Sequence, residues 1–324
     1  MGNNSVVWGV IGCGDVTEVK SGPAFQKCEN SELLAVMRRN GALAQDFAKR
    51  HNVPLWYDDA DNLLANPDIN AVYIATPPST HLEYALKALK AGKDVYLEKP
   101  IVLSKEEATA LENAANSSKH KLVVAHYRRF LPMYIQVKEL LDSHAIGDIK
   151  FVDLRFLQPF DFNSKATWRL DEEVSGGGYF HDLAPHQLDL MYHFFGNYTE
   201  AKGIAVNQSG INSVDDTVNG IINFKNGIQF RGMWSFTIPN YLKEDRCIIY
   251  GEDGTIELSF YEEQLKLKSK NINKEYNFKN PENIQQPMIQ ETVNYFLEKR
   301  SNPCPVQDGV LVINLMEAFT KDNI

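Results

Sequence analysis

Short apolar runs alternate with amphipathic segments over the first 125 residues of the chain. Residues 81–91 carry apolar side chains at helical spacing, and Ser104 with Glu107 forms a capping box that predicts the start of a further helix. The apolar runs are residues 6–11, 33–37, 71–75, 94–97 and 122–125. Such nearly continuous runs are typical of strands buried on both faces, and strands that alternate with helices predict a doubly wound parallel sheet.

From residue 150 onward the pattern changes to strand-like runs separated by short turns. Asn226-Gly227 and Asp253-Gly254 each lie between two such runs, and these dipeptides are strong hairpin signals. Residues 177–196 are predicted to form a helix, and residues 289–299 and 309–319 are predicted to close the chain as helices. Successive hairpins predict a large, mainly antiparallel sheet with one open face.

Composition narrows the class of protein. The 324 residues favour two domains, and 44% hydrophobic with 23% charged residues is ordinary for a globular protein. The net charge of −9 argues against general binding of nucleic acid or an anionic membrane. Four scattered cysteines without a Cys-x-x-Cys pair predict neither a zinc knuckle nor a disulfide framework. With no apolar run of membrane-spanning length and no signal peptide, we expect a cytoplasmic protein.

A glycine-rich turn follows the first predicted strand. Gly12 allows a tight turn, and Gly14 lets the backbone approach a pyrophosphate at a helix N-terminus. Thr17 stands where the third glycine of the dinucleotide fingerprint is expected, so the motif is imperfect. The predicted pyrophosphate site comprises Gly12, Cys13, Gly14, Asp15 and Val16.

The second predicted strand ends in two arginines, Arg38 and Arg39. NAD-binding sites usually have an acidic residue here for the ribose 2′-hydroxyl, whereas a guanidinium can bind a 2′-phosphate. An arginine stacked on adenine, or a solvated strand end, is the alternative. We therefore favour NADP over NAD.

The ends of the predicted parallel strands point to one crevice. Gly12, Arg38, Thr76 and Lys99 each follow a strand, and ligands of doubly wound sheets bind outside the carboxyl ends of the strands. We predict a Rossmann-type NAD(P)-binding domain at 1–125. The remainder, 126–324, is predicted to be an α+β domain for substrate binding and oligomerisation.

A polar stripe lies on the helix predicted after Gly177-Gly178. Asp182 and His186 are four residues apart and share a face, and Asp189 and His193 continue the stripe. A helix with a polar edge is one interpretation and a metal site is another. A stripe of about three turns is too long for all four side chains to reach one ion, so we predict no metal.

Five motifs occur in order along the chain. They are Gly12-Cys13-Gly14, Ala75-Thr76-Pro77-Pro78-Ser79-Thr80-His81, Glu98-Lys99-Pro100, Trp168-Arg169-Leu170, and Gly177-Gly178 through Asp182 to His186 and Asp189. Together they resemble the glucose-fructose oxidoreductase/inositol dehydrogenase (Gfo/Idh/MocA) family over nearly the whole chain. The resemblance implies a Rossmann domain joined to a domain with a large antiparallel sheet. It also implies oxidation or reduction of sugars and cyclic polyols with a nicotinamide cofactor.

The resemblance also implies roles for single residues. Lys99, Asp182 and His186 match catalytic positions: His186 would exchange the proton of the reacting oxygen, and Lys99 would hydrogen-bond that oxygen. The cofactor contacts expected beyond the pyrophosphate site are Arg38, Arg39, Thr76, Pro77, Pro78, His81, Glu98, Lys99, Trp168 and Arg169. The expected substrate contacts are His126, Tyr127, Arg129, Asp182 and His186. A cis bond before Pro100 rests on the resemblance alone.

Three positions depart from the family pattern: Thr17, Arg38 and Ala184-Pro185. We predict an NAD(P)-dependent dehydrogenase or reductase that acts on a sugar, cyclic polyol or keto-sugar and assembles as a homodimer or homotetramer. Two alternatives stay open. One is an NAD-dependent glycosidase that acts by transient oxidation and elimination, and the other is a non-catalytic regulator that binds the cofactor.

Overall fold

The computed structural model describes residues 4–159 and 167–321. The chain folds into two compact units: Met1–Arg128 with Pro281–Ile313, and Arg129–Asn280 with Asn314–Ile324. We call them the first and second units. The predicted division at residue 125 follows chain order, whereas in the structure a late segment returns to the first unit.

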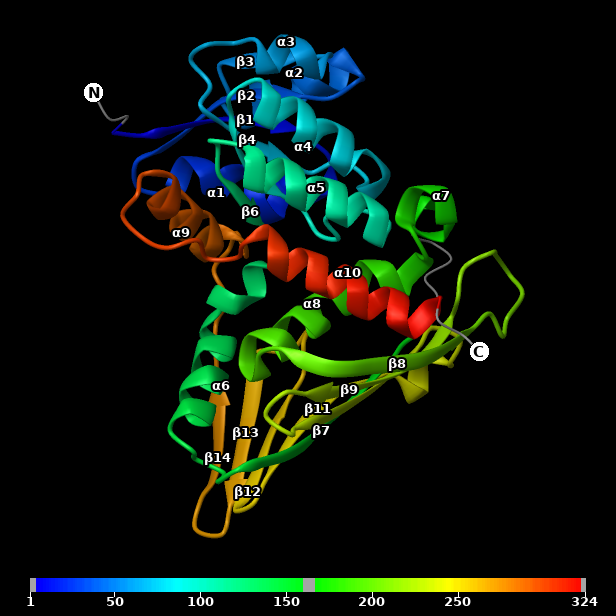
Figure 1. Cartoon of the computed structure of the whole chain (residues 1–324). Helices are drawn as coiled ribbons and strands as arrows, with labels where there is room; N and C mark the ends of the chain where they lie inside the picture. The colour runs from blue at the N-terminus through cyan, green and yellow to red at the C-terminus, as the bar shows by residue number, and fades with distance from the viewer. Residues whose placement is uncertain (1–3, 160–166, 322–324) are drawn as a thin grey trace. The chain divides into compact units, whose positions relative to one another are not determined.

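The first unit is built on a six-stranded sheet with the order β3-β2-β1-β4-β5-β6, in which all neighbours are parallel (Figure 1). The strands are β1 (Val6–Ile11), β2 (Ser31–Met37), β3 (Leu55–Tyr57), β4 (Ala71–Ile74), β5 (Asp94–Leu97) and β6 (Leu122–Val124). This order confirms the predicted doubly wound fold. The strand order reverses between β1 and β4, which is where ligands of such sheets bind.

Helices cover both faces of this sheet. The helices of the first unit are η1 (Thr17–Ser21), α1 (Gly22–Lys27), α2 (Gly41–Arg50), α3 (Ala60–Leu64), η2 (Pro78–Thr80), α4 (His81–Lys90), α5 (Lys105–Ser117) and α9 (Gln286–Phe296). The alternation along β1 separates the layers: the ring of Trp8 packs on Phe25 of α1 and Phe296 of α9, whereas Gly9 faces Leu63 of α3. The helix η3 (Tyr127–Phe130) and the helix α10 (Val306–Thr320) each begin in the first unit and end in the second.

The second unit contains an eight-stranded sheet with the order β14-β13-β12-β11-β7-β10-β9-β8. Only the pair of β7 and β10 is parallel, so the predicted, mainly antiparallel sheet is confirmed. Asn226-Gly227 and Asp253-Gly254 join neighbouring strands, as expected. The strands are β7 (Ile149–Leu157), β8 (Tyr198–Val206), β9 (Thr217–Phe224), β10 (Gln229–Ser235), β11 (Glu244–Gly251), β12 (Gly254–Leu258), β13 (Gln264–Ser269) and β14 (Asn273–Asn277).

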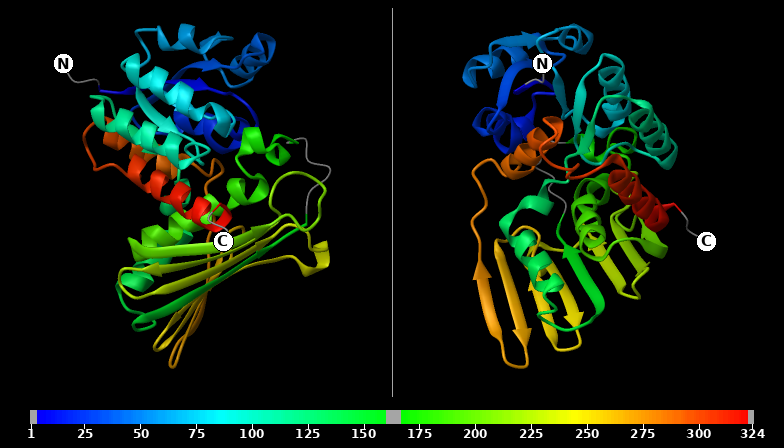
Figure 2. Two further views of the ribbon diagram at one scale, coloured as in Figure 1. Left: turned by 45° about the vertical axis from the view of Figure 1, so that its right-hand side comes forward. Right: turned by 60° about the vertical axis from the view of Figure 1, so that its left-hand side comes forward.

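One face of this sheet is packed under helices, as Figure 2 shows. The buried Trp234 of β10 packs against Phe180 and Phe319, which come from α8 (Gly178–Phe195) and α10. The opposite face carries exposed side chains, with Phe151 stacked on Tyr250. The remaining helices of this unit are α6 (Pro132–Asp142), η4 (Thr167–Leu170), α7 (Glu172–Ser175) and η5 (Asn240–Leu242).

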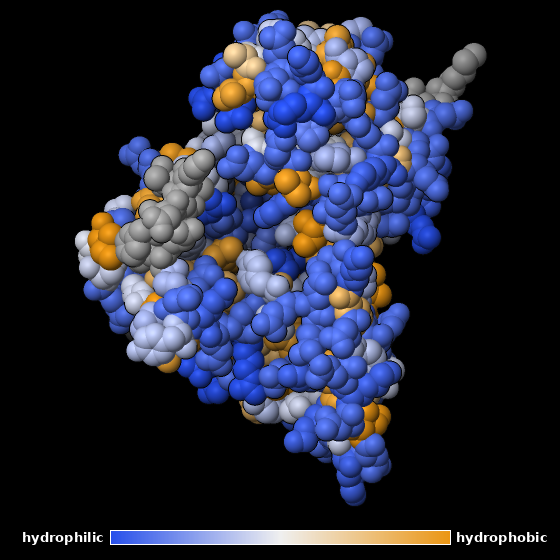
Figure 3. All heavy atoms as spheres, turned by 180° about the vertical axis from the view of Figure 1, so that it is seen from behind, coloured by the Kyte–Doolittle hydropathy of each residue, from blue (hydrophilic) through white to orange (hydrophobic). Residues whose placement is uncertain are grey.

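The surface seen in Figure 3 is mostly hydrophilic, with apolar residues scattered over it. Among the helices of the described ranges, none combines the length and the apolar character that a membrane crossing requires.

Candidate functional site

The glycine-rich turn after β1 is wedged between the ends of two neighbouring strands. The backbone N–H groups of Gly12 and Cys13 both donate to the Met37 carbonyl at the end of β2. Gly12 has a φ of +100°, and a Cβ there would lie 2.8 Å from the backbone of both Ala75 and Thr76 after β4. Because only glycine tolerates this approach, the residue fixes the turn at the strand-order reversal.

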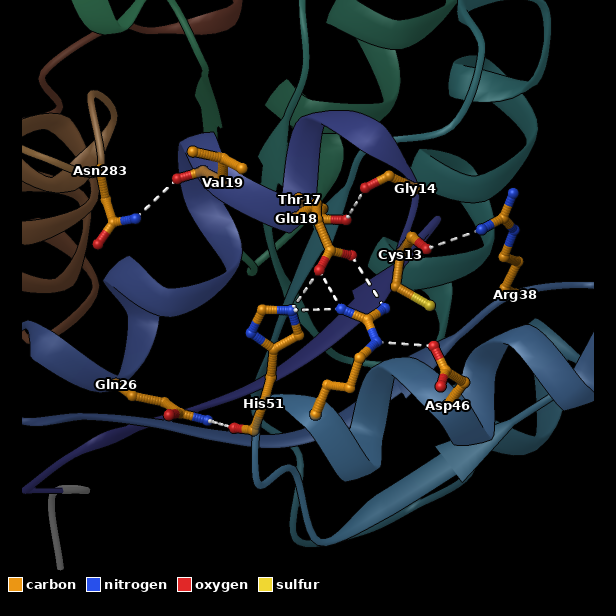
Figure 4. Close-up of polar contacts among 11 residues, drawn as sticks. Cys13, Gly14, Thr17, Glu18, Val19, Gln26, Arg38, Asp46, His51 and Asn283 are labelled. Carbon is orange, nitrogen blue, oxygen red and sulfur yellow. Dashed lines mark hydrogen bonds and ion pairs between the residues drawn. The ribbon is translucent and has the colours of Figure 1, made fainter.

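The second glycine of the turn leaves room beside the backbone. A Cβ on Gly14 would meet nothing within 4 Å, and the helical segment starts immediately after it (Figure 4). Thr17, which replaces the third glycine of the fingerprint, is fully buried. Its hydroxyl donates to the Gly14 carbonyl at 2.7 Å and so stabilises the turn. An open backbone at the start of a helix fits the pyrophosphate of a dinucleotide. Asp15 is exposed and Val16 half-buried at this start.

Arg38 lies beside this turn. Its Nη1 atom donates to the Cys13 carbonyl at 3.5 Å, and its backbone N–H donates to the Tyr57 carbonyl (Figure 4). Its side chain is half-buried, whereas that of Arg39 is exposed. A guanidinium thus lies at the end of β2, where the ribose of a dinucleotide binds in doubly wound sheets.

A cluster of charged side chains lies next to the fingerprint turn, and no motif in the sequence predicted it. Glu18 of η1 accepts hydrogen bonds from Arg50 and His51, and Arg50 also donates to Asp46 of α2 (Figure 4). The hydrogen bond from Arg50 holds the pKa of Glu18 below its usual range. The cluster therefore joins η1, the helix that follows the fingerprint turn, to the end of α2.

The loops after β4 and β5 are tied together by a buried histidine. The ring of His81 is 1% exposed, and its two nitrogens lie 2.8 Å from the carbonyl oxygens of Thr76 and Pro100. Burial lowers the pKa of His81. Pro77 accepts a hydrogen bond from Thr80, and Pro78 is buried. His81 thus contacts protein atoms on both sides, whereas a direct cofactor contact stays a prediction.

The turn after β5 carries Lys99, and the Lys99-Pro100 bond is cis, as the resemblance implied. Glu98 is buried, and its Oε2 atom accepts from the Lys99 backbone N–H at 3.1 Å. Its Oε1 atom accepts from the Tyr73 hydroxyl at 2.5 Å and from Gln285 Nε2 at 2.7 Å. Glu98 therefore points into the protein, while Lys99 is half-buried at the carboxyl edge of the sheet.

In the second unit, four predicted residues lie in η4 and in the first half of α8. Arg169 donates from Nε to Asp182 Oδ2 at 2.5 Å, and its guanidinium lies over the Trp168 ring, 4.7 Å from the centroid. His186 follows Asp182 by one turn and is buried. The helix runs without interruption through Pro185, so the departure at Ala184-Pro185 does not break it.

Three further residues of the second unit, Arg129, Asp189 and His181, are buried and contact other protein groups. Arg129 forms a buried, bidentate ion pair with Asp189, with Nη2–Oδ1 at 2.6 Å and Nε–Oδ2 at 3.0 Å. His181 is also buried: one of its ring nitrogens lies 3.0 Å from the Gly177 carbonyl oxygen, and burial lowers its pKa to about 4. His181 is therefore neutral near pH 7.

The predicted site residues thus form two sets. The first unit brings together the fingerprint turn, Arg38, Thr76, His81 and the Glu98-Lys99-Pro100 turn, and the second unit brings together Trp168, Arg169, Asp182 and His186. That the two sets meet stays a prediction, as do substrate contacts of the buried His126 and Tyr127. Sequence reasoning missed Tyr73 and Gln285, which carry no motif. Within the described residues, no group of three His, Cys, Asp or Glu side chains is arranged to hold a metal ion.

The fold and the fingerprint turn define a protein with a Rossmann-type dinucleotide-binding domain. A family model described as the oxidoreductase family with an NAD-binding Rossmann fold matches residues 6–126. A model of the GFO/IDH/MocA C-terminal domain matches residues 134–257. The chain belongs to the Gfo/Idh/MocA oxidoreductase family.

Named relatives agree with this assignment. Oxidoreductase P35 of Formosa agariphila is 49% identical over 96% of this chain and 97% of its own length. Trans-1,2-dihydrobenzene-1,2-diol dehydrogenase of Xenopus laevis is 27% identical over 78% of this chain and 74% of its own length.

Solved structures share the fold. An oxidoreductase of Thermotoga maritima has a TM-score of 0.87 at 24% identity, covering 97% of this chain and 95% of its own. A levoglucosan dehydrogenase in complex with NADH and levoglucosan has a TM-score of 0.85 at 23% identity, covering 97% and 96%. A 3-ketoreductase of Actinomadura kijaniata in complex with NADP has a TM-score of 0.84 at 21% identity, covering 97% of each chain.

Proposed function

We propose that this oxidoreductase is an NADP-preferring dehydrogenase or reductase that acts on a CH–OH group of a sugar, cyclic polyol or keto-sugar. The observation that carries the proposal is the position of Lys99, which follows β5 at the same sheet edge as the fingerprint turn after β1. The relatives named as a trans-1,2-dihydrobenzene-1,2-diol dehydrogenase, a levoglucosan dehydrogenase and a 3-ketoreductase support this substrate class.

The chemistry divides between the two sets of residues. The fingerprint turn would hold a nicotinamide cofactor, which would supply hydride chemistry when bound. The Lys99 ammonium hydrogen-bonds the reacting oxygen and stabilises negative charge on it in the transition state. His186 takes the hydroxyl proton in oxidation and returns it in reduction. Asp182, which accepts from Arg169, orients the substrate or the Lys99 and His186 side chains.

The cofactor preference rests on Arg38. Its half-buried guanidinium lies beside the fingerprint turn at the end of β2, where a 2′-phosphate would accept charge-assisted hydrogen bonds. Arg39, exposed next to it, adds positive charge.

The assembly we propose is a homodimer or homotetramer through the uncovered face of the eight-stranded sheet. That face exposes Phe151, stacked on Tyr250, and Ile221, alongside ion pairs such as Arg231–Asp153. The sedimentation coefficient of the Phe151→Lys variant tests this interface. A lysine at this position would bury a charge between the subunits and dissociate the oligomer. An unchanged sedimentation coefficient would contradict the interface. A cytoplasmic location stays a prediction.

The proposed function is tested by screening sugars, polyols and keto-sugars with NADP(H) and NAD(H), following nicotinamide absorbance. With the best substrate, Lys99→Ala and His186→Ala are each expected to lower kcat by at least about 100-fold while NADPH affinity changes little. His193→Ala on the same helix is the control. Near-normal turnover of the Lys99 or His186 variant would remove that residue from the chemistry.

A further inference from the structure

The backbone around Lys99 is held by the buried polar side chains of Glu98 and His81. We propose that Glu98 and His81 are positioning residues: together they clamp the Lys99-Pro100 turn and thereby fix where the Lys99 side chain starts. This inference rests on the proposed function of Lys99. It assigns Glu98 and His81 a role through protein contacts, and it adds Gln285 as the anchor of the clamp.

Glu98 holds the Lys99 side of the turn. Its Oε2 atom accepts from the backbone N–H of Lys99 itself, and its Oε1 atom accepts from Tyr73 and Gln285. Glu98 is 6% exposed. Burial, together with the nearby Glu98, raises the pKa of Tyr73 well above its ordinary value, so Tyr73 keeps its proton and donates. Glu98 therefore accepts from three donors of the protein, one of which is the backbone N–H of Lys99.

His81 contacts the Pro100 side of the same turn. One ring nitrogen faces the Pro100 carbonyl and the other faces the Thr76 carbonyl, each at 2.8 Å. These carbonyls belong to the loops after β5 and β4, and the Thr76 backbone is the one that packs against Gly12. Because burial lowers its pKa, His81 is a neutral imidazole with one N–H and donates to one of these carbonyls. Its ring lies between the two loops and links the Lys99 turn to the loop that packs against Gly12.

Gln285 anchors this arrangement from a distant part of the sequence. Its Oε1 atom accepts from the Tyr96 hydroxyl at 3.2 Å, and its backbone N–H donates to the Lys20 carbonyl. Asn283 nearby donates to the Val19 carbonyl, so the same segment holds η1 (Figure 4). The Lys99 turn and the fingerprint helix therefore share one buried anchor.

The geometry matters because the Lys99 nitrogen must meet the reacting oxygen within hydrogen-bond distance. A displacement of about 1 Å can lower turnover about 100-fold. Replacing Glu98 by leucine leaves three buried donors without their acceptor, and the turn must shift to satisfy them. Glu98→Gln keeps one oxygen for the Lys99 N–H, and the Gln285 amide can rotate to accept from the new amide group.

The experiment compares Glu98→Leu, Glu98→Gln and His81→Phe in the full chain, with two readouts. Residue-resolved amide hydrogen exchange at Lys99 reports the clamp without a substrate, and kcat with the Kd for NADPH reports its effect on the site. Asp94→Leu is the matched control: Asp94 accepts the Lys121 backbone N–H at the opposite end of the same strand. Gln285→Leu provides a milder variant if Glu98→Leu does not fold.

In Glu98→Leu and His81→Phe we expect the backbone amide hydrogen of Lys99 to exchange at least about 10-fold faster than in the wild type. We also expect kcat to be about 10-fold to 100-fold lower. The Kd for NADPH should change much less, Glu98→Gln should recover most of kcat, and Asp94→Leu should behave as wild type. Gln285→Leu should shift exchange and kcat in the same direction. Unchanged exchange at Lys99, or a loss confined to NADPH affinity, overturns the inference.

Failure of the proposed function has a different signature. If Lys99→Ala turns over normally, Lys99 is not catalytic even where the exchange data confirm the clamp. If Lys99→Ala is inactive and Glu98→Leu keeps full kcat, the clamp alone is wrong.

Discussion

The buried ion pair between Arg129 and Asp189 gives a sharp prediction about which residues of the second unit are structural. The side chains are 5% and 1% exposed, and the contact is bidentate, at 2.6 and 3.0 Å. Removing one partner of a buried ion pair typically costs about 3–5 kcal/mol, because the remaining charge stays buried and loses its bidentate partner. An exposed pair would contribute only about 0–1 kcal/mol.

Asp189→Leu should therefore lower the melting temperature by about 6–20 °C, since 1 kcal/mol shifts a domain of this size by about 2–4 °C. The double variant Arg129→Met with Asp189→Leu should recover most of this loss, because a well-packed apolar pair avoids the desolvation of two charges. Calorimetry of the wild type, both single variants and the double variant measures the coupling.

Turnover of the double variant separates the two roles proposed for Arg129. If the pair is structural, the double variant keeps its KM for the substrate. A raised KM in a stable double variant would return Arg129 to the predicted substrate contacts. A double variant no more stable than Asp189→Leu would refute the desolvation argument itself.

Three further predictions concern the first unit. Arg38→Asp should weaken NADPH binding about 10-fold to 100-fold, by fluorescence titration, and NADH binding much less; equal losses would mean that Arg38 does not contact a 2′-phosphate. Gly12→Ala should cost about 1–3 kcal/mol in denaturant unfolding, because a Cβ there meets backbone, whereas Gly14→Ala should leave stability unchanged and weaken dinucleotide binding. The lowered pKa of Glu18, caused mainly by Arg50, implies stability that is present above the unfolded pKa of about 4.3 and lost as pH falls through the folded value. Arg50→Met should remove that acid-dependent part, and an unchanged pH profile of unfolding would contradict it.

Local signals in the sequence predicted much of the fold. The apolar runs became the parallel strands, the Asn226-Gly227 turn became a hairpin, and the helix after Gly177 formed with Asp182 and His186 one turn apart. These features depend on neighbouring residues, which a pattern reports directly. The helices α2 and α6 were not predicted.

Contacts between distant residues could not be predicted in the same way. Gln285 reaches Glu98 across 187 positions, and Arg129 reaches Asp189 across 60. The sequence around Gln285 or Arg129 gives no sign of these partners, because tertiary packing determines which distant residues meet. The same limit explains why the roles of Glu98 and His81 as internal contacts emerged only from the structure.

The return of residues 281–313 to the first unit affects how the protein is made. Trp8, in the first strand, packs against Phe296, and the Val124 N–H at the edge strand donates to the Cys304 carbonyl. During synthesis, the first unit therefore cannot complete its core until nearly the whole chain has left the ribosome. The second unit also depends on a late segment, because Phe319 of α10 packs on Trp234 of its sheet, so neither unit can complete its core from a contiguous stretch of chain.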